Sequence, residues 1–385
     1  MSVLPNVEIE LVRDGLGLIA GTNDNTCALI CPGVAVADLL VLNTPYAIYS
    51  TDGARELGIE PDGVNAVAFK QIAEFYAVAG VGAKLWVMIV AATVKLSDMV
   101  DPVADPSPAK VLISAGAGEI VALGCVSGAA TATTVDGLDE DVYAAMVKGQ
   151  VLADSFTDKI MPYVTVLEGK GFSDADSLRD LSGEDKYRIA VALCATSIDT
   201  VAAIGLVLGS IAANPVQRKI SRIKNGALPI TSGFLTDAGT IEEREDLATI
   251  HGKRYIILRK FPNRSGYFFN GDFTATSQTD DLNLIARVRV IDKAMKIAYN
   301  TYVEELDDDV EVNNDGTLNR SVAAYLKDKI EAQVNGAMAG EISRFEATVD
   351  TSIDILAGNA QKIFLDIVPR GYLNPIRVVL GFKNE

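Results

Sequence analysis

The chain has 385 residues, of which 49% are hydrophobic and 22% charged. It is long and apolar enough for two or three folded domains, so a single small domain and a wholly disordered chain are both excluded. Fifty-one acidic residues against 34 basic ones give a formal net charge of −17. This balance disfavours a general phosphate-binding surface, and we expect no nucleic acid as a partner.

The sulfur and imidazole side chains are few. The four cysteines are Cys27, Cys31, Cys125 and Cys194. They are too few and too scattered for a disulfide scaffold in a chain of this length, so we expect buried free thiols. Cys27 and Cys31 have no second cysteine pair downstream, and the single histidine, His251, cannot build a multi-histidine zinc site. We therefore expect no metal and no cofactor.

The N-terminal residues alternate between apolar and polar side chains. Val7, Ile9 and Leu11 are the apolar positions, and this period of two predicts an extended arm or an edge strand. The glycines of residues 15–21 lack the spacing of a dinucleotide-binding loop, and residues 23–25 do not open the helix that such a loop needs. No secretory signal is visible, so we expect synthesis to end in a cytoplasm.

From Thr26 the chain alternates buried β-like runs with amphipathic helices. The predicted strands are residues 27–34, 84–90, 162–167 and 187–194, and the predicted helices are residues 65–79, 141–159 and 201–213. Strands and helices that follow one another in this way imply a parallel or mixed sheet. Residues 101–107 are rich in proline and are expected to form a linker or surface loop.

One apolar stretch, residues 189–213, is long enough to span a bilayer. Asp199 lies near its centre, where a charge is costly in lipid. The stretch also divides into a β-like run, a polar joint and a helix-like run. We therefore expect a buried strand followed by a buried helix, with Ser197 or Asp199 as the N-cap and no direct membrane insertion.

After residue 226 the pattern changes to strands and long helices. The predicted elements are a hairpin of residues 255–261 and 266–276, helices at residues 286–306 and 318–343, and strands at residues 362–368 and 376–382. Residues 304–315 are strongly acidic and are expected to form a solvated loop.

No arrangement of side chains predicts catalysis. A Ser-His-Asp triad would have to use His251, and the chain has no G-x-S-x-G nucleophile elbow. It also lacks the G-x-x-x-x-G-K-[ST] loop that cradles phosphates in nucleotide hydrolases. Acidic pairs such as Glu242-Glu243 lack the spacing of a calcium-binding loop and are interpreted as solvated faces. We expect no catalytic residue.

A basic run stands out in this acidic chain. Residues 217–224 contain four positive side chains and no acidic one. The four are Arg218, Lys219, Arg222 and Lys224. The run can be a solvated loop or helix end. It can also dock an acidic neighbouring subunit, with residues 304–309 as the expected source of the acids.

Five short segments bear on the family. Gly266-Tyr267-Phe268-Phe269 has the form G-Y-[YF]-[FW], and residues 286–290 begin a helix with arginines. Residues 324–340 form a helix that ends in a glycine-rich turn, and residues 366–378 are an extended ending. In the first half of the chain, residues 73–87 pass from a helix with aromatic residues through glycines to a strand. In their order these segments resemble the contractile tail sheath proteins of phages, tailocins and related injection systems. Residues 289–293 lack the second arginine of the family's double-arginine pattern.

The resemblance implies a mixed α/β fold in two parts. An N-terminal arm of residues 1–22 would join a core domain of residues 231–385, which combines β-strands, long helices and a C-terminal strand arm. Residues 23–230 would form an outer domain rich in βαβ units. No enzymatic activity is implied.

The resemblance also implies the partners. Many copies would form a helical homopolymer around an inner tail tube, in contact with baseplate and tail terminator proteins, and would contract to drive the tube through a target envelope. The subunit would be assembled in a bacterial cytoplasm and belong to a phage tail or contractile particle.

Two further sets of contacts follow from the resemblance. Intersubunit strands are expected at the two ends of the chain, with apolar positions Val7, Ile9, Leu11, Ile376, Val378 and Leu380. The helix of residues 318–343 is expected to face the inner tube, with Lys327, Lys329, Gly336, Gly340 and Arg344 as contacts. Small residues there allow close approach of another backbone, and the charges give contacts that can be broken.

Two other classes of protein remain open at this point. One is a Rossmann-like enzyme on a doubly wound sheet, with a ligand near Gly33 or Gly169 at the carboxyl ends of strands. The other is a tail tube or capsid protein, although tubes are usually shorter and richer in strands.

Overall fold

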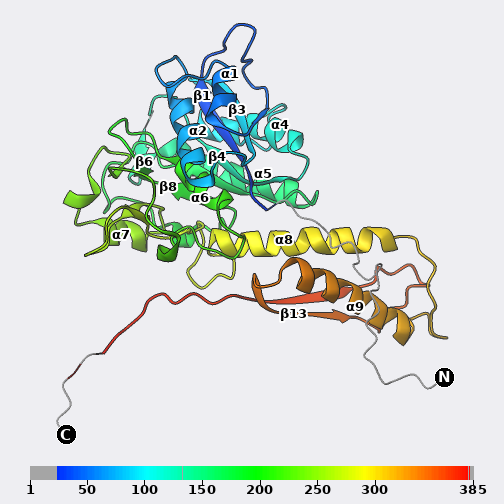
Figure 1. Cartoon of the computed structure of the whole chain (residues 1–385). Coiled ribbons are helices and arrows are strands. Elements are labelled where there is room, and N and C mark those ends of the chain that lie inside the picture. Colours follow the sequence, from blue (N-terminus) through cyan, green and yellow to red (C-terminus); the bar gives the residue numbers. More distant parts are fainter. Residues whose placement is uncertain (1–23, 132, 380, 382–385) are drawn as a thin grey trace, which may run out of the picture. The chain divides into compact units, whose positions relative to one another are not determined.

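The computed structural model describes residues 24–131, 133–379 and 381 (Figure 1). Its main sheet has six strands in the order β2-β3-β1-β4-β7-β8. These are β1 (Thr26–Gly33), β2 (Tyr46–Ile48), β3 (Leu85–Ala91), β4 (Ile120–Cys125), β7 (Val164–Glu168) and β8 (Ile189–Ala192). Five strands run parallel, and the edge strand β2 pairs antiparallel with β3. The chain changes direction across the sheet at β1, as in doubly wound folds.

Helices cover both faces of this sheet. The helices are α1 (Thr51–Glu56), α2 (Ala66–Ala79), α3 (Leu96–Met99), α4 (Pro108–Ala115), α5 (Glu140–Thr157) and α6 (Ile204–Ala212). α2 and α6 pack together on β1, while α4 and α5 pack on the other face, against β3 and β7. Because neither face meets water, the strands are continuous apolar runs without alternation, which is the pattern seen in the sequence.

The predicted mixed α/β class is therefore confirmed, and the predicted strands and helices of residues 26–213 are present. Several shorter elements between them were not predicted. Among these, α4 and β4 occupy residues 108–125, where proline and glycine surround short apolar runs. A run of six to eight residues carries too little periodicity to distinguish a helix from a strand.

The prediction of Ser197 or Asp199 as the N-cap of α6 is wrong. The N-cap is Ala203, whose side chain makes no capping hydrogen bond. Gln71 of α2 takes that role, because its Oε1 accepts the N–H of Gly205 at 2.7 Å. A cap supplied by a different helix cannot be read from the residues that precede α6.

α2 and α6 approach closely at two glycines. A Cβ built on Gly205 would lie 1.9 Å from the carbonyl oxygen of Gln71, and one on Gly209 would lie 2.6 Å from that of Phe75. Both neighbours are backbone atoms, which cannot turn away as a side chain can. The spacing of four residues puts both glycines on one face of α6, so the two helix backbones can come into contact.

The substitution Gly205→Ala is expected to lower the free energy of unfolding by about 1–2 kcal/mol. Separation of the helices costs about 1–3 kcal/mol, and the higher helix propensity of alanine offsets up to about 1 kcal/mol of it. Urea unfolding measures the change. Gly252→Ala is the matched control, since Gly252 also lies in a helix and a Cβ there meets no atom within 4 Å. Equal stability of the two variants would contradict the close approach.

Residues 134–269 also contain several short elements. They are β5 (Thr134–Val135), β6 (Leu138–Asp139), β9 (Cys194–Ala195), β10 (Phe234–Leu235), β11 (Leu258–Arg259) and β12 (Phe268–Phe269), the helix α7 (Leu247–Gly252), and single 3-10 turns at Leu181–Gly183, Ile223–Asn225 and Ile241–Glu243. The paired strands are β5 with β6, β9 with β10, and β11 with β12.

The predicted hairpin of residues 255–276 is present only as the short pair β11–β12. The backbone on either side of it bonds elsewhere. The N–H of Ile256 donates to the carbonyl of Val191 at 3.0 Å, and the N–H of Ala275 donates to that of Ile189 at 2.7 Å. These residues look β-like in sequence because they pair with the edge strand β8.

The C-terminal third contains two long helices and a two-stranded sheet. The elements are α8 (Ile285–Tyr302), a 3-10 turn (Val303–Glu305), α9 (Arg320–Ala337), β13 (Ile342–Val349) and β14 (Ile363–Pro369), with β13 paired to β14. α9 ends before the predicted residue 343, because Gly340 adopts φ +78° and β13 follows at once. β14 matches the predicted strand of residues 362–368, whereas β13 was not predicted.

Within the described part of residues 376–382, the predicted strand is not formed. The described residues 370–379 make no β pairing, and Ile376 and Val378 are exposed. The prediction for Leu380 lies outside the described residues, as do those for Val7, Ile9 and Leu11.

The chain forms two compact units. Among the described residues, the smaller unit contains residues 297–339 and 345–366, and the larger contains residues 24–296, 340–344 and those after 366. Residues 231–296 belong to the same unit as the sheet, and the predicted division into residues 1–22, 23–230 and 231–385 stays a prediction. Among the described helices, none has the length and hydrophobicity needed to cross a bilayer.

Candidate interaction surfaces

Two glycines that lie at the carboxyl ends of the parallel strands are closely packed by the protein's own atoms. A Cβ added at Gly33, after β1, would lie 2.3 Å from Asn65 Oδ1. Asn65 is fixed there, since its Oδ1 accepts the Val34 N–H at 2.8 Å and its Nδ2 donates to the Val34 carbonyl at 3.0 Å. At Gly169, after β7, a Cβ would lie 2.4 Å from Leu193 Cδ2. Both glycines are therefore in close contact with the chain, and a cavity of about 370 Å³ lies beside Gly169, lined by residues that include Glu168 and Lys170.

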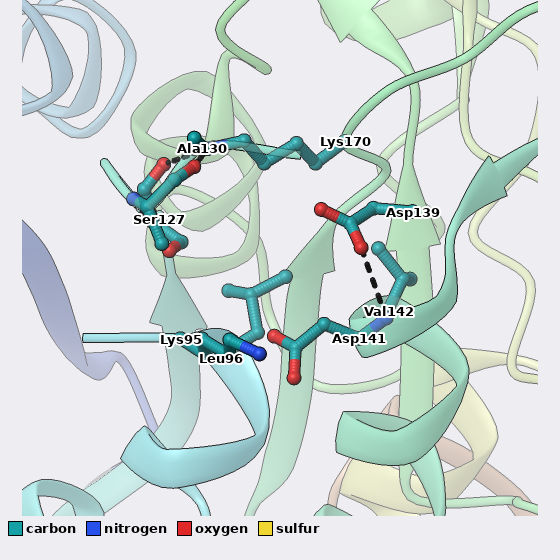
Figure 2. A pocket seen from close by; sticks show the side chains of 9 residues that line it. Lys95, Leu96, Ser127, Ala130, Asp139, Asp141, Val142 and Lys170 are labelled. Carbon is teal, nitrogen blue, oxygen red and sulfur yellow. Dashed lines mark hydrogen bonds between the residues drawn. The ribbon is translucent and has the colours of Figure 1, made fainter. Parts of the chain in front are cut away.

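A small pocket lies beside this edge of the sheet (Figure 2). Lys170 Nζ donates to the Ser127 carbonyl at 2.9 Å and also to the Ala129 carbonyl. Asp139 Oδ1 accepts the backbone N–H of Asp141 at 3.2 Å. The volume of about 10 Å³ has room for one water molecule at most. The charged side chains around this small pocket hold loops in place, and Lys170 also lines the neighbouring cavity of about 370 Å³.

The prediction of buried free thiols is confirmed for all four cysteines. Burial raises the pKa of Cys27 and of Cys194 to about 12, so their reactive thiolate forms are strongly disfavoured at neutral pH. Among the described residues, no group of three His, Cys, Asp or Glu side chains is placed to hold a metal ion.

Two buried carboxyl groups hold the loop before α6. Glu168 accepts the Ser127 N–H at 2.9 Å and the Ala202 N–H at 3.2 Å. Glu74 accepts a hydrogen bond from the Thr196 hydroxyl through Oε1, while its buried Oε2 has no partner among the described residues. Burial is the main cause that raises the pKa of each carboxyl to about 7. Neither residue was predicted; a glutamate that ends an apolar strand was the available signal for Glu168.

α2 contributes a third contact to the same loop. Lys70 Nζ donates to Ser197 Oγ at 2.7 Å and to Asp199 Oδ2 at 2.8 Å. The charge at Asp199 that argued against a membrane span is thus paired at the protein surface.

The basic run divides into two groups. Lys219 is turned toward the protein, where its Nζ lies 3.4 Å from Asp272 Oδ1 and its side chain is 11% exposed. Asp272 is buried, so this contact lies within the subunit, and an intersubunit role of Lys219 stays a prediction. Arg218, Arg222 and Lys224 line a surface cavity of about 340 Å³ and form no ion pair with another described residue. For these three, the intersubunit contact stays a prediction.

The C-terminal segment is anchored next to the same run. Tyr372 Oη donates to the Gln217 carbonyl at 2.7 Å, and Lys219 Nζ lies 5.3 Å from the centre of the Tyr372 ring. After this anchor the apolar side chains are exposed, with Leu373 at 89% and Val378 at 79%. The apolar side chains of residues 373–379 are thus left uncovered by the subunit itself.

The residues predicted to face the tube do not share one helix. Lys327 and Lys329 lie on α9 and pair with Glu331 and Glu305, whereas Gly336 is exposed near the end of α9. Gly340 follows the helix, and Arg344 lies in β13. The lysines are therefore engaged within the smaller unit, and the tube contact stays a prediction.

Solved structures with the same fold cover the whole chain. The helical sheath of the anti-feeding prophage (AFP) in its contracted state superposes with a TM-score of 0.66 over 100% of both chains, at 12% identity. The contracted sheath complex of an extracellular contractile injection system, PVC, gives 0.57 over 100% of this chain and 98% of the other, at 12% identity. A sheath tail protein from Listeria innocua gives 0.51, over 91% and 96%, at 9% identity.

The predicted resemblance to contractile sheath proteins is thus confirmed at the level of the fold. The chain belongs to the DUF2586 family, whose N-terminal domain matches residues 4–272 and whose C-terminal domain matches residues 281–385. No curated protein is significantly similar to it in sequence.

Proposed function

We propose that the protein is the structural subunit of a contractile tail sheath, which polymerises around an inner tube and contracts to drive that tube through a target envelope. The observation that carries this proposal is the end-to-end likeness to the AFP helical sheath, which leaves no part of either chain unmatched.

Contraction needs two packings of one subunit that differ in free energy, and no reacting group. The larger unit provides a preformed core, in which β1, β3 and β7 are buried under helices on both faces. Apolar surface that becomes buried between the larger units of neighbouring subunits during contraction would release free energy. Summed over many subunits, this free energy would supply the mechanical work of contraction. The exposed segment after Tyr372 would tie neighbours together while the other interfaces change.

Negative-stain electron microscopy of the purified full chain tests the proposal. Hollow cylinders are expected, and their assembly should be favoured by a co-expressed tube protein. Discrete monomers or dimers under all conditions would contradict a sheath role and favour the enzyme class. Thin tubes or closed shells would instead identify a tail tube or capsid protein.

The proposed partners are further copies of the chain, the inner tail tube, the baseplate and the tail terminator. Likeness to chains in AFP baseplate structures supports the baseplate contact, with TM-scores of 0.61 and 0.59 at 12% and 14% identity. The protein would be assembled in a bacterial cytoplasm and end in a phage tail or contractile particle. Crosslinks from α9 to the tube before contraction, lost afterwards, are expected; crosslinks confined to residues 100–180 would contradict the tube contact.

The two ends of the chain are proposed to add strands to a neighbouring subunit, with the sheet of β13 and β14 as the acceptor. Deletion of residues 1–14 should leave a folded monomer and abolish long cylinders, because the core strands lie elsewhere. Sedimentation velocity and microscopy measure the outcome. Full-length cylinders from the truncated chain, or loss of its cooperative unfolding transition, would contradict strand exchange by this arm.

A further inference from the structure

A hollow in the larger unit combines a basic rim with an apolar floor. We call it the basic pocket; its rim carries Arg218, Arg222 and Lys224, and its floor includes Phe268 and Phe269. The two phenylalanines are 6% and 2% exposed, so they form a fixed surface. The volume of about 340 Å³ is enough for several side chains of a bound segment.

The rim charges are not neutralised within the described chain. Ion pairs to Arg218, Arg222 and Lys224 are absent among the described residues, in contrast to the neighbouring Lys219. Arg222 Nη1 donates to Asn225 Oδ1 at 3.0 Å, and this contact holds the guanidinium at the rim. Three such cations around one hollow create a local positive potential on a chain whose net charge is −17.

The chain itself contains a segment with the complementary chemistry. Residues 306–310 read Leu-Asp-Asp-Asp-Val, and all five are exposed. Their carboxylates form no ion pair with described residues, because Lys329 is taken up by Glu304 and Glu305 before them. Leu306 is 71% exposed and places an apolar side chain beside the acids.

We propose that the basic pocket receives residues 306–310 of a second copy of the chain. Guanidinium groups would bind the aspartates through paired charge-assisted hydrogen bonds, while Leu306 would enter over Phe268. The inference rests on the proposed polymer, which places many copies side by side. It names which acidic segment and which basic residues make one of the lattice contacts.

A peptide titration tests the pocket without assembly. A fluorescent peptide of residues 303–312 should bind the full chain at concentrations where the chain is monomeric. Affinity should fall at least about tenfold between 50 and 500 mM salt, because exposed charges are screened over about 10 Å at 0.1 M. A peptide with asparagine at positions 307–309 should bind at least about tenfold more weakly. Equal affinity of the two peptides would overturn the proposal.

Charge reversal identifies the pocket. The variant Arg218→Glu, Arg222→Glu, Lys224→Glu should lose the peptide. The control Lys95→Glu, Lys159→Glu, Arg264→Glu changes the net charge equally, at exposed positions of the same unit, and should keep it. Thermal melting of both variants separates loss of binding from loss of folding. Equal weakening in both variants would assign the effect to net charge and overturn the site.

A charge swap tests the contact between copies. One variant reverses the three charges of the basic pocket, and a second replaces Asp307, Asp308 and Asp309 by lysine. Each variant alone should slow cylinder assembly at low salt. Both sets of substitutions combined in one chain should restore assembly. No gain in the combined variant would overturn the contact. Crosslinks between pocket and segment within single monomers would overturn the second copy as occupant. A wild-type chain that binds the peptide and forms no cylinders would contradict the sheath proposal and leave the pocket standing.

Discussion

Replacement of Asp292 by alanine is expected to lower the free energy of unfolding by about 3–5 kcal/mol, because it leaves a buried guanidinium with only the more distant Asp154 carboxylate, 3.9 Å from Arg188 Nε, as counter-charge. Arg188 Nη1 and Nη2 lie 3.0 and 2.9 Å from the two carboxylate oxygens of Asp292. The side chains are 3% and 9% exposed, so water cannot replace the lost carboxylate. The Tyr163 carbonyl, at 3.3 Å from Nη1, would remain as a partner. Urea unfolding at pH 7 measures the change.

Two controls separate burial from charge. The double variant Arg188→Met, Asp292→Leu removes both charges and should recover most of the lost stability, since apolar pairs replace buried ion pairs at little cost. Asp52→Ala breaks a pair with Arg55 at 2.7 Å whose side chains are 80% and 46% exposed, and it should cost less than about 1 kcal/mol. A cost for Asp292→Ala as small as that for Asp52→Ala would contradict a buried pair.

The position of this pair gives it a role beyond stability. Arg188 directly precedes β8, and Asp292 lies in the part of α8 that belongs to the larger unit. α8 then continues into the smaller unit from residue 297. The bidentate contact fixes the rotation of the helix on the sheet, because the planar guanidinium group donates both hydrogen bonds to the carboxylate in one plane. In the proposed sheath, the connection between the units would start from a helix held in one register.

The main sheet was predictable because its elements carry long, uniform patterns. β1 and β3 are runs of seven or eight residues that are almost entirely buried, and their sequences are apolar throughout. α2 buries residues such as Phe69, Ile72 and Tyr76 at helical spacing. In each case local patterning and tertiary packing require the same residues, so the sequence alone indicates the element.

The contacts within the candidate surfaces were not predictable in the same way. The basic run reads as four equal charges, yet Lys219 reaches Asp272, 53 positions later by residue number, and the other three do not. Lys219 differs from the other three basic residues in that its side chain is packed against the protein. Which residues of a loop become buried depends on elements that are far away in the chain. Arg188 and Asp292 are 104 positions apart. Such pairs have no periodicity that one sequence can display.

Element ends were predicted least well, for reasons that are local to each end. The N-cap of α6 is replaced by Gln71 from another helix, so residues 197–199 gave the wrong start. α9 was extended to residue 343 because its apolar spacing continues past Gly340. The left-handed backbone of that glycine ends the helical path and allows β13 to begin at Ile342.

Glu74 gives the stability of the larger unit a dependence on pH. Burial, opposed in part by Thr196 and Lys70, raises the pKa of its carboxyl from 4.5 to about 7. Between these values the unfolded chain loses the proton while the folded chain keeps it, so the free energy of unfolding falls as the pH rises through this window and is level above about pH 7. At about 1.4 kcal/mol per pKa unit the full effect is about 3 kcal/mol, and partial solvent exposure reduces it to about 2 kcal/mol.

The variant Glu74→Gln should therefore be more stable than the wild type by about 2 kcal/mol at pH 8 and equally stable at pH 5. Glutamine keeps an oxygen to accept the Thr196 hydroxyl and removes the charge at the buried oxygen that has no partner among the described residues. Guanidinium chloride unfolding at a series of pH values measures the difference in the free energy of unfolding between variant and wild type. Glu168 is present in both proteins, so its contribution over the same pH range cancels in this difference. Glu56→Gln, at an exposed position of α1, should change stability by less than about 0.5 kcal/mol at either pH. A Glu74→Gln variant that is less stable than the wild type at pH 8 would show that the carboxylate is held in its charged form by Lys70, and that the loop of residues 196–203 depends on that charge.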